Sequence, residues 1–431
     1  MEEIKRLVEK LEGVVEWSKA HPGSTLRELE EQVQKAIEQI RVELMETAVA
    51  QQGGGRVLEE EACKCGGRWV FQGYRERWVR TREGTIRVRR AYYTCERCSA
   101  GFFPLDRQLE TRGGWSEGAI EDVLWVAQAM SSYREAEEAL QRLAHLKVPK
   151  TTIHRMVERY GSALVQQRQA EATTLWESGV KGEEPPPPRE GQKAELGIGL
   201  DGVMVHVDGE WHEVKVGCCF DFGPGKGGEV EAQEVGYLAW YGEVEAFRRT
   251  MWGYAYHRGL GMEGKGVVIG DGAVWIDGFA EMYCPKGVRI VDWYHAVEHL
   301  WTLGQEAYGE KATGWVERMK NHLWRGEVDA VVEGCEALLA TREGWSAEAA
   351  RTAGYFRERA DRMRYPEFRA AGYPIGSGTV ESGCKGIGWR CKSRGQRWKR
   401  KGLTAILSLR SAGMGGKKEW NQAWELIRQA A

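Results

Sequence analysis

The sequence predicts a soluble, multidomain protein of mixed α/β class, in which helical segments precede a strand-rich region. The chain has 431 residues, 42% hydrophobic and 29% charged, as expected of a protein with at least one sizeable core. Apolar residues recur at helical spacing in residues 1–50 and 115–165, whereas residues 193–240 alternate like strands. The proline-rich segment 177–192, ESGVKGEEPPPPREGQ, separates the two patterns and predicts a semi-rigid linker at a domain boundary.

Residues 1–55 predict a helical hairpin. The motif HPGST (21–25) interrupts the apolar periodicity, with Ser24 or Thr25 as the expected N-cap of the second helix, and QQGGG ends that helix. The pattern leaves open whether the hairpin packs against the protein or mediates self-association.

Residues 56–110 predict a β-hairpin held between two cysteine pairs. ERWVRTREGTIRVRRAYYT (76–94) alternates polar and apolar residues around a turn, and the pairs are Cys63, Cys65, Cys95 and Cys98. Four thiolates converging on one ion are typical of a structural zinc ribbon. The C-x-C half is tighter than the usual C-x₂-C, and four unrelated thiols are the alternative.

Residues 111–176 predict a helix-turn-helix domain. SYREAEEALQRLAHLKVPKTTIHRMVERYG (132–161) gives a helix, a turn at LKVPK and a second helix capped by Thr151 or Thr152. That helix would present four side chains to a major groove: Lys150, Thr151, His154 and Arg155. Any helical hairpin shares this pattern, so an ordinary helix pair is the alternative.

After the linker, residues 193–412 predict a mixed α/β domain. Three consecutive strands, a helix, a strand, a helix and a strand follow one another, and a helical insertion occupies about 296–366. Residues 413–431 are expected to form a C-terminal tail.

Positive charge is concentrated near the C-terminus. The net charge is −2, yet residues 382–418 hold eleven Lys or Arg and no acid, which favours a polyanion such as nucleic acid over a solvated surface helix. Trp389 and Trp398 lie among these cations and could stack on exposed bases. The expected DNA contacts are Lys385, Arg390, Lys392, Arg394, Arg397, Lys399, Arg400 and Lys401.

Three carboxylates are candidate metal ligands. Asp201 lies in an apolar strand, Asp271 ends another, and Glu381 follows GSG near a helix start. A buried unpaired carboxylate is costly, and Mg²⁺ is a natural compensating cation. The alternative is that each aspartate, being followed by glycine, is only a turn residue. Asp208, Asp221 and Asp277 are alternative candidates for the metal-binding carboxylates.

Several stretches resemble the bacterial insertion-sequence transposases of the Kra type, which are DDE enzymes. They include LDGVMVHVDGEWHEVKVG, GDGAVWI, VDWYHAVEHLW, GSGTVESGCKGIGWRCKSRGQRWKRKG and the cysteine segment YYTCERCSAGFFPLD. The resemblance covers residues 60–412 and implies an RNase H-like, retroviral-integrase-type catalytic domain. It also implies that Asp201, Asp271 and Glu381 bind two Mg²⁺ ions, with Mn²⁺ as the alternative. The D-x-x-H motif of Asp292 and His295 resembles one found in Mutator-like transposases, which makes these two residues catalytic candidates.

The resemblance implies a transposase that binds terminal inverted repeats, hydrolyses a phosphodiester and joins the free 3′-hydroxyl to target DNA. Two repeats must be brought together, so a homodimer or larger assembly is expected. The alternatives are a nuclease without strand transfer and a DNA-binding regulator. A glycosidase is disfavoured, because the basic segment 382–418 has no role in such an enzyme. The N-terminus lacks a signal peptide and no apolar run is long enough to span a membrane, so we expect a cytoplasmic, nucleoid-associated bacterial protein.

Overall fold

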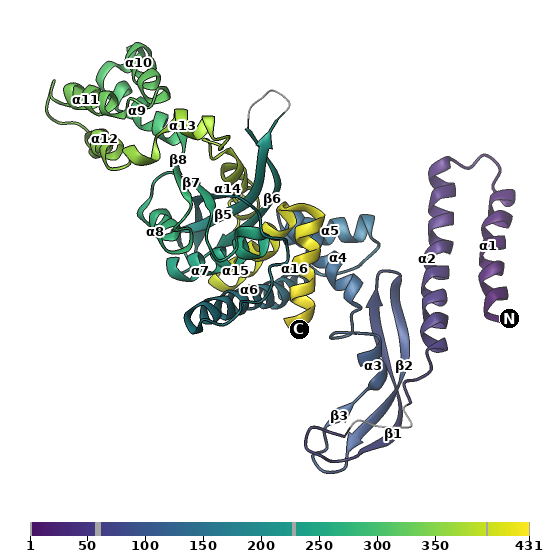
Figure 1. Ribbon diagram of the computed structural model, residues 1–431. Coiled ribbons are helices and arrows are strands. Elements are labelled where there is room, and N and C mark those ends of the chain that lie inside the picture. The colour runs from purple at the N-terminus through teal and green to yellow at the C-terminus, as the bar shows by residue number, and fades with distance from the viewer. Residues whose placement is uncertain (1, 57–61, 226–229, 394, 431) are drawn as a thin grey trace. The chain divides into compact units, whose positions relative to one another are not determined.

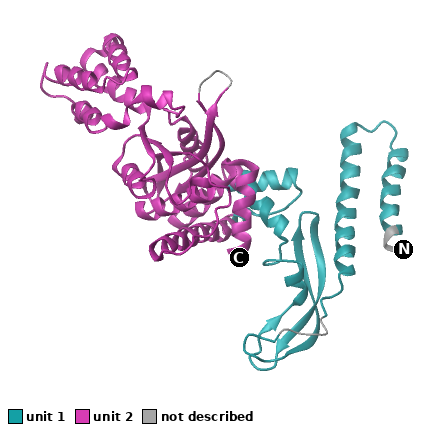
Figure 2. Cartoon of the chain, in the orientation of Figure 1, with its two compact units in different colours: residues 1–127, 133–153 teal, residues 128–132, 154–431 magenta. Residues whose placement is uncertain are grey.

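The chain is described here by a computed structural model that covers residues 2–56, 62–225, 230–393 and 395–430. It divides into two compact units, residues 1–127 with 133–153 and residues 128–132 with 154–431 (Figure 2). Both contain helices and a sheet, which confirms the mixed α/β class. The division falls near residue 153, inside a long helix, and not at the proline-rich segment.

The first unit begins with the predicted helical hairpin, α1 (Glu2–Ala20) and α2 (Leu26–Gln51). Thr25 is the N-cap of α2. Its side chain accepts from the backbone N–H of Glu28, and the side chain of Glu28 accepts from the backbone N–H of Thr25, which completes a capping box. The antiparallel strands β1 (Trp69–Thr81) and β2 (Gly84–Cys95) follow, with short β3 (Gly101–Phe102) at the edge. Their small core holds Val79, Ile86, Val88 and Leu105 together with Val49 of α2.

Three short helices and the start of a long one complete the first unit: α3 (Pro104–Gln108), α4 (Glu117–Ala129), α5 (Tyr133–Leu143) and α6 (Lys150–Lys181). The predicted turn lies between α5 and α6. The predicted caps Thr151 and Thr152 instead lie inside the first turn of α6, because the carbonyl of Pro149 already accepts from Thr152 and Ile153. The helix also continues into the first five residues of the predicted linker.

The second unit is built on a five-stranded sheet in the order β6-β5-β4-β7-β8 (Figure 1). The first three strands along the chain form an antiparallel meander, and β7 and β8 run parallel to β4. All five strands were predicted, and their bounds are β4 (Leu196–Val207), β5 (Glu210–Pro224), β6 (Val230–Trp240), β7 (Gly266–Gly270) and β8 (Val288–Val291).

Helices cover both faces of this sheet. One face packs its core side chains, such as Ile198 and Val268, against Phe247 of α7 (Val244–Ala255) and Phe279 of α8 (Val274–Tyr283). On the other face, Gly199 lets α14 (Gly378–Cys391) approach closely, since a Cβ there would lie 3.0 Å from Val380. The remaining elements are η1 (Tyr256–Leu260), α9 (Trp293–Tyr308), η2 (Gly309–Lys311), α10 (Thr313–Trp324), α11 (Val328–Leu339), α12 (Ala347–Glu358), η3 (Ala360–Arg362), α13 (Tyr365–Ala370), α15 (Arg400–Met414) and α16 (Gly416–Ala430). Helices α9–α13 form the predicted insertion between β8 and α14.

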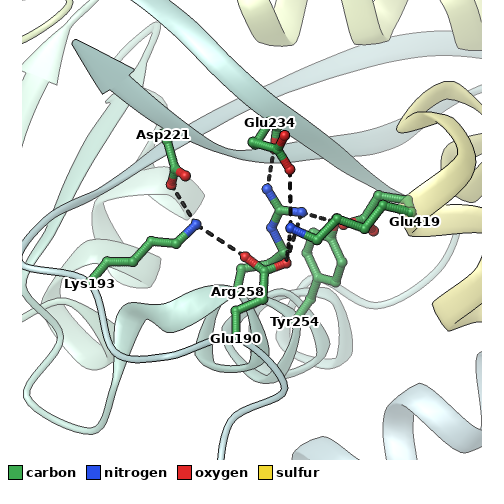
Figure 3. Close-up of polar contacts among 8 residues, drawn as sticks. Glu190, Lys193, Asp221, Glu234, Tyr254, Arg258 and Glu419 are labelled. Atoms are coloured by element: carbon green, nitrogen blue, oxygen red, sulfur yellow. Dashed lines mark hydrogen bonds and ion pairs between the residues drawn. The ribbon is translucent and has the colours of Figure 1, made fainter.

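Of two segments expected to lie outside the core, the C-terminal one belongs to it and the linker is tied to it by polar contacts. The predicted tail forms α16, which buries Glu419, Trp420 and Leu426. Glu419 pairs with Arg258 at 2.5 Å, both side chains being 2% exposed, and accepts from Tyr254 at 2.7 Å (Figure 3). From the predicted linker, Glu190 lies 3.2 Å from Arg258. Paired charge therefore holds both segments to the second unit.

Candidate functional site

Two of the predicted carboxylates lie at matched positions on neighbouring parallel strands. Gly199 of β4 is paired with Ile269 of β7, so Asp201 and Asp271, each two residues further, take corresponding places. Side chains alternate across a sheet, so both lie on the face of Gly199, opposite the core formed with α7 and α8. Here β7 and its pairing with β4 end, although β4 itself continues to Val207, and the carboxyl side of parallel strands is where open α/β sheets bind ligands.

Helix α14 brings the third predicted residue to the same face. Its first turn carries Glu381, whose backbone N–H donates to the carbonyl of Ser377. One turn further, the thiol of Cys384 donates to Oδ2 of Asp201 at 3.4 Å. The sequence analysis did not single out Cys384, although its spacing of three from Glu381 puts the two on one face of a helix.

Asp292 is a buried connector between two elements of the site. Its carboxylate is 0% exposed, caps α9 by accepting from the backbone N–H of His295 at 2.7 Å, and also accepts from the backbone N–H of Ser377. Ser377 is the N-cap residue of α14. Asp292 thereby ties the start of α9 to the start of the helix that carries Glu381.

The electrostatics of Asp292 and His295 make them a charged pair. Burial alone would raise the pKa of Asp292, but hydrogen bonds from His295 and Ser377 lower it overall. The hydrogen bond to Asp292 and the charges of Asp292 and Asp201 outweigh burial and raise the pKa of His295 to about 9. His295 is therefore an imidazolium near Asp201 at neutral pH.

Asp201 and Asp271 differ from the alternative candidates in having no cationic partner. Neither forms an ion pair within the described residues. By contrast, Asp208, Asp221 and Asp277 pair with Lys399, Lys193 and Arg362 at 2.9, 2.5 and 2.5 Å. Burial, together with the nearby charge of Asp271, raises the pKa of Asp201 despite its hydrogen bonds from Gly202 and Cys384.

Glu381 does not share a metal position with the two aspartates in this structure. Its carboxylate lies 2.7 Å from the ammonium of Lys385, one turn along α14. In the part of the chain that is described, the four cysteines are the one group of three or more ligands close enough to hold a single ion.

The helical insertion contacts the backbone at Asp271. The hydroxyl of Tyr355 donates to the carbonyl of Asp271 at 3.0 Å, and Nε of Arg359 donates to the carbonyl of Gly272 at 3.1 Å. His299, one turn after His295, packs on the Tyr355 ring at 3.9 Å between centroids. No local pattern points to Tyr355 or Arg359, because 84 and 87 positions separate them from their acceptors.

Most of the predicted DNA contacts form an exposed basic surface around the start of α15. Arg397, Lys399, Arg400, Lys401 and, nearby, Lys392 are exposed. Lys401 lies 3.4 Å from Glu158, and His154 lies 3.5 Å from the same residue, which brings part of α6 to this surface. Lys150, Thr151 and Arg155 are exposed on α6.

Two residues of the basic segment differ from expectation. Arg390 is 1% exposed and donates to the carbonyl of Ser131, so it is not accessible to DNA in this structure. Trp398 is 8% exposed and donates to the carbonyl of Cys391, whereas Trp389 stays half exposed. Arg394 lies outside the described residues.

The cysteine cluster in the first unit fits a tetrahedral metal. The Sγ–Sγ distances are 3.7 Å for Cys63–Cys98 and 3.5 Å for Cys65–Cys95, and all four sulfurs lie within 4.8 Å of one another. Zinc–thiolate bonds of about 2.3 Å put tetrahedral sulfurs about 3.8 Å apart. Gly66, with φ of +77°, makes the tight C-x-C turn possible, because its backbone folds back onto Cys63. The cluster could bind a metal such as zinc.

The uncharacterised protein family UPF0236 matches residues 19–179 of the chain. The match runs from the end of α1 into α6 and stops before β4, so it does not reach the carboxylates of the sheet. No curated protein matches the chain. Within the described residues, no helix has the length and apolarity needed to cross a membrane.

Proposed function

We propose that the chain is a DNA transposase whose second unit has an RNase H-like fold. The observation that carries the proposal is the pair Asp201, within β4, and Asp271, just after the neighbouring parallel strand β7, neither of which forms an ion pair within the described residues. The strand order, with an antiparallel meander followed by two parallel strands, supports the RNase H-like assignment. The exposed basic surface at α15 supports a nucleic-acid substrate.

The carboxylates suit Mg²⁺ as the cofactor. Mg²⁺ prefers oxygen ligands and needs only one or two carboxylates besides phosphate oxygens and water, so Asp201 and Asp271 would hold it. Such an ion supplies a nucleophile of lowered pKa and stabilises charge on the phosphate. Glu381 would become a third Mg²⁺ ligand once its carboxylate separates from Lys385. Lys385 would then be free to contact a phosphate.

Other residues of the chain would position the DNA. The imidazolium of His295 would donate a hydrogen bond to a phosphate oxygen beside Asp201. The basic surface would bind the DNA backbone, and the zinc-binding hairpin and α5–α6 would bind the terminal repeats. The two ends of an element would require a dimer or larger assembly.

The test is cleavage and joining of paired DNA ends carrying the element's terminal repeats, with Mg²⁺ or Mn²⁺. Asp201→Asn, Asp271→Asn and Glu381→Gln should each lower cleavage by about 1,000-fold or more while repeat binding persists. Asp221→Asn removes an acid already paired with Lys193 and should cleave like the wild type.

Each alternative gives a distinct outcome of the same assay. Cleavage without joining would identify a nuclease, and repeat binding by the wild-type protein without Mg²⁺-dependent nicking would identify a regulator. Near wild-type cutting by Asp201→Asn or Asp271→Asn would refute the assignment of the site.

A further inference from the structure

A small cavity lies among α6, α7 and α16, on the side of the sheet that the catalytic proposal does not use. Its walls include Arg168, Arg189, His257, Tyr254 and Glu419, and its volume is about 20 Å³. That volume is enough for one small molecule or a monatomic ion.

Arg168 brings an unneutralised charge to this cavity. The residue is 8% exposed, and its Nη1 has no hydrogen-bond partner among the described residues. The guanidinium packs 5.6 Å from the Tyr254 ring centroid, which does not neutralise it. An arginine stays protonated even when buried, so the charge has to be balanced by an anion.

The two acids that line the cavity already have other partners. Glu419 is bound through one oxygen by Arg258 and through the other by Tyr254. Glu171 is bound by Arg189. Their charges act on Arg168 from a distance, but neither forms an ion pair with it within the described residues.

A second buried donor lines the same cavity. Nδ1 of His257 is also buried and has no partner in the described part of the chain. Burial and the charge of Arg189 lower the pKa of His257 to about 4, so the ring is neutral and can donate from one nitrogen without adding charge. Nη1 of Arg168 and Nδ1 of His257 are therefore two buried nitrogens at the same small cavity, and neither has a hydrogen-bond partner among the described residues.

We propose that this cavity binds a monovalent anion of the size of chloride, held by Arg168 and His257. A water molecule could accept the two hydrogen bonds but would leave the arginine charge unbalanced. The anion would stabilise the packing of α16 against α6 and α7. The site is independent of the proposed transposase activity.

Thermal unfolding of the whole protein in potassium chloride and in potassium gluconate, at equal ionic strength, tests the proposal. Chloride at 150 mM should raise the melting temperature by about 2–4 °C over gluconate, which is a much larger and more weakly binding anion. Arg168→Met should abolish this difference. Arg159→Met, which removes an exposed arginine of the same helix, should preserve it.

Bromide provides a second measurement that does not depend on folding of the variant. Crystals of the wild-type protein grown in sodium bromide should show an anomalous peak beside Arg168. A water peak without anomalous signal, or a melting temperature equally insensitive to chloride in wild type and Arg168→Met, would overturn the proposal.

Discussion

The second unit contains two clusters of charge, and they are neutralised in different ways. Around Arg258, the carboxylates of Glu419 and Glu190 and the hydroxyl of Tyr254 surround a fully buried guanidinium. Asp201, within β4, and Asp271, just after β7, are half-buried and form no ion pair within the described residues, although the charge of His295 acts on Asp201. Both clusters lie against the same sheet, on opposite faces.

The difference indicates which cluster is structural and which is available for a ligand. Charges that are buried with their partners stabilise one packing. Carboxylates held at a strand end without partners make the folded state less stable, and such a cost is typical of a functional site. Four predictions test this comparison, from the largest expected effect to the smallest.

Glu419→Gln should cause the largest loss of stability, because it leaves Arg258 buried without its closest partner. We expect the free energy of unfolding to fall by about 3–5 kcal/mol, measured by urea denaturation. Lys418→Met, at the exposed rim of the same cluster, should cost less than about 1 kcal/mol. Equal effects of the two variants would show that the Arg258 cluster is not structural.

Asp292→Asn tests the connector between α9 and α14. The amide retains one acceptor oxygen but loses the charge that accepts from His295 and Ser377, so we expect a loss of about 2–3 kcal/mol. The loosened α14 should also lower DNA cleavage if the proposed function holds. Stability equal to wild type would contradict the connecting role of Asp292.

His295 should make stability depend on pH. Its pKa, raised to about 9 from an ordinary 6.5, means that the folded state binds the proton more tightly than the unfolded chain. The stabilisation is complete below pH 6.5 and is lost as the pH rises through 9. His295→Gln should therefore be less stable than wild type by about 1–2 kcal/mol at pH 6 and similar to it at pH 10, by urea denaturation. A difference independent of pH would contradict the Asp292–His295 ion pair.

Asp201→Asn should have the smallest effect on stability, and one of opposite sign. Because burial raises the pKa of Asp201, the ionised carboxylate costs stability above its unfolded pKa, and removing the charge should gain about 1 kcal/mol or leave stability unchanged at pH 7. Mg²⁺ should raise the melting temperature of wild type by about 2 °C and have no effect on the variant. A strongly destabilised Asp201→Asn would assign this aspartate to the structure instead of a metal site.

The sequence by itself determined the elements and part of the site. Alternating side chains predicted all five strands of the second unit, and Thr25 was among the expected caps of α2. Asp201 and Asp271 could be singled out because each is a lone carboxylate in an apolar strand run. These features depend on side-chain spacings of two to four residues or on the order of the elements along the chain. Both can be read from the sequence.

Only the tertiary structure decided which charges are buried and which are free. Arg258 and Glu419 are 161 positions apart, and nothing near either residue in the chain indicates their pairing. For the same reason the basic segment 382–418 did not reveal that Arg390 is buried, and the predicted tail did not reveal that it belongs to the core. The burial of a charge depends on partners distant in sequence, because desolvation must be offset by groups that the fold alone brings together.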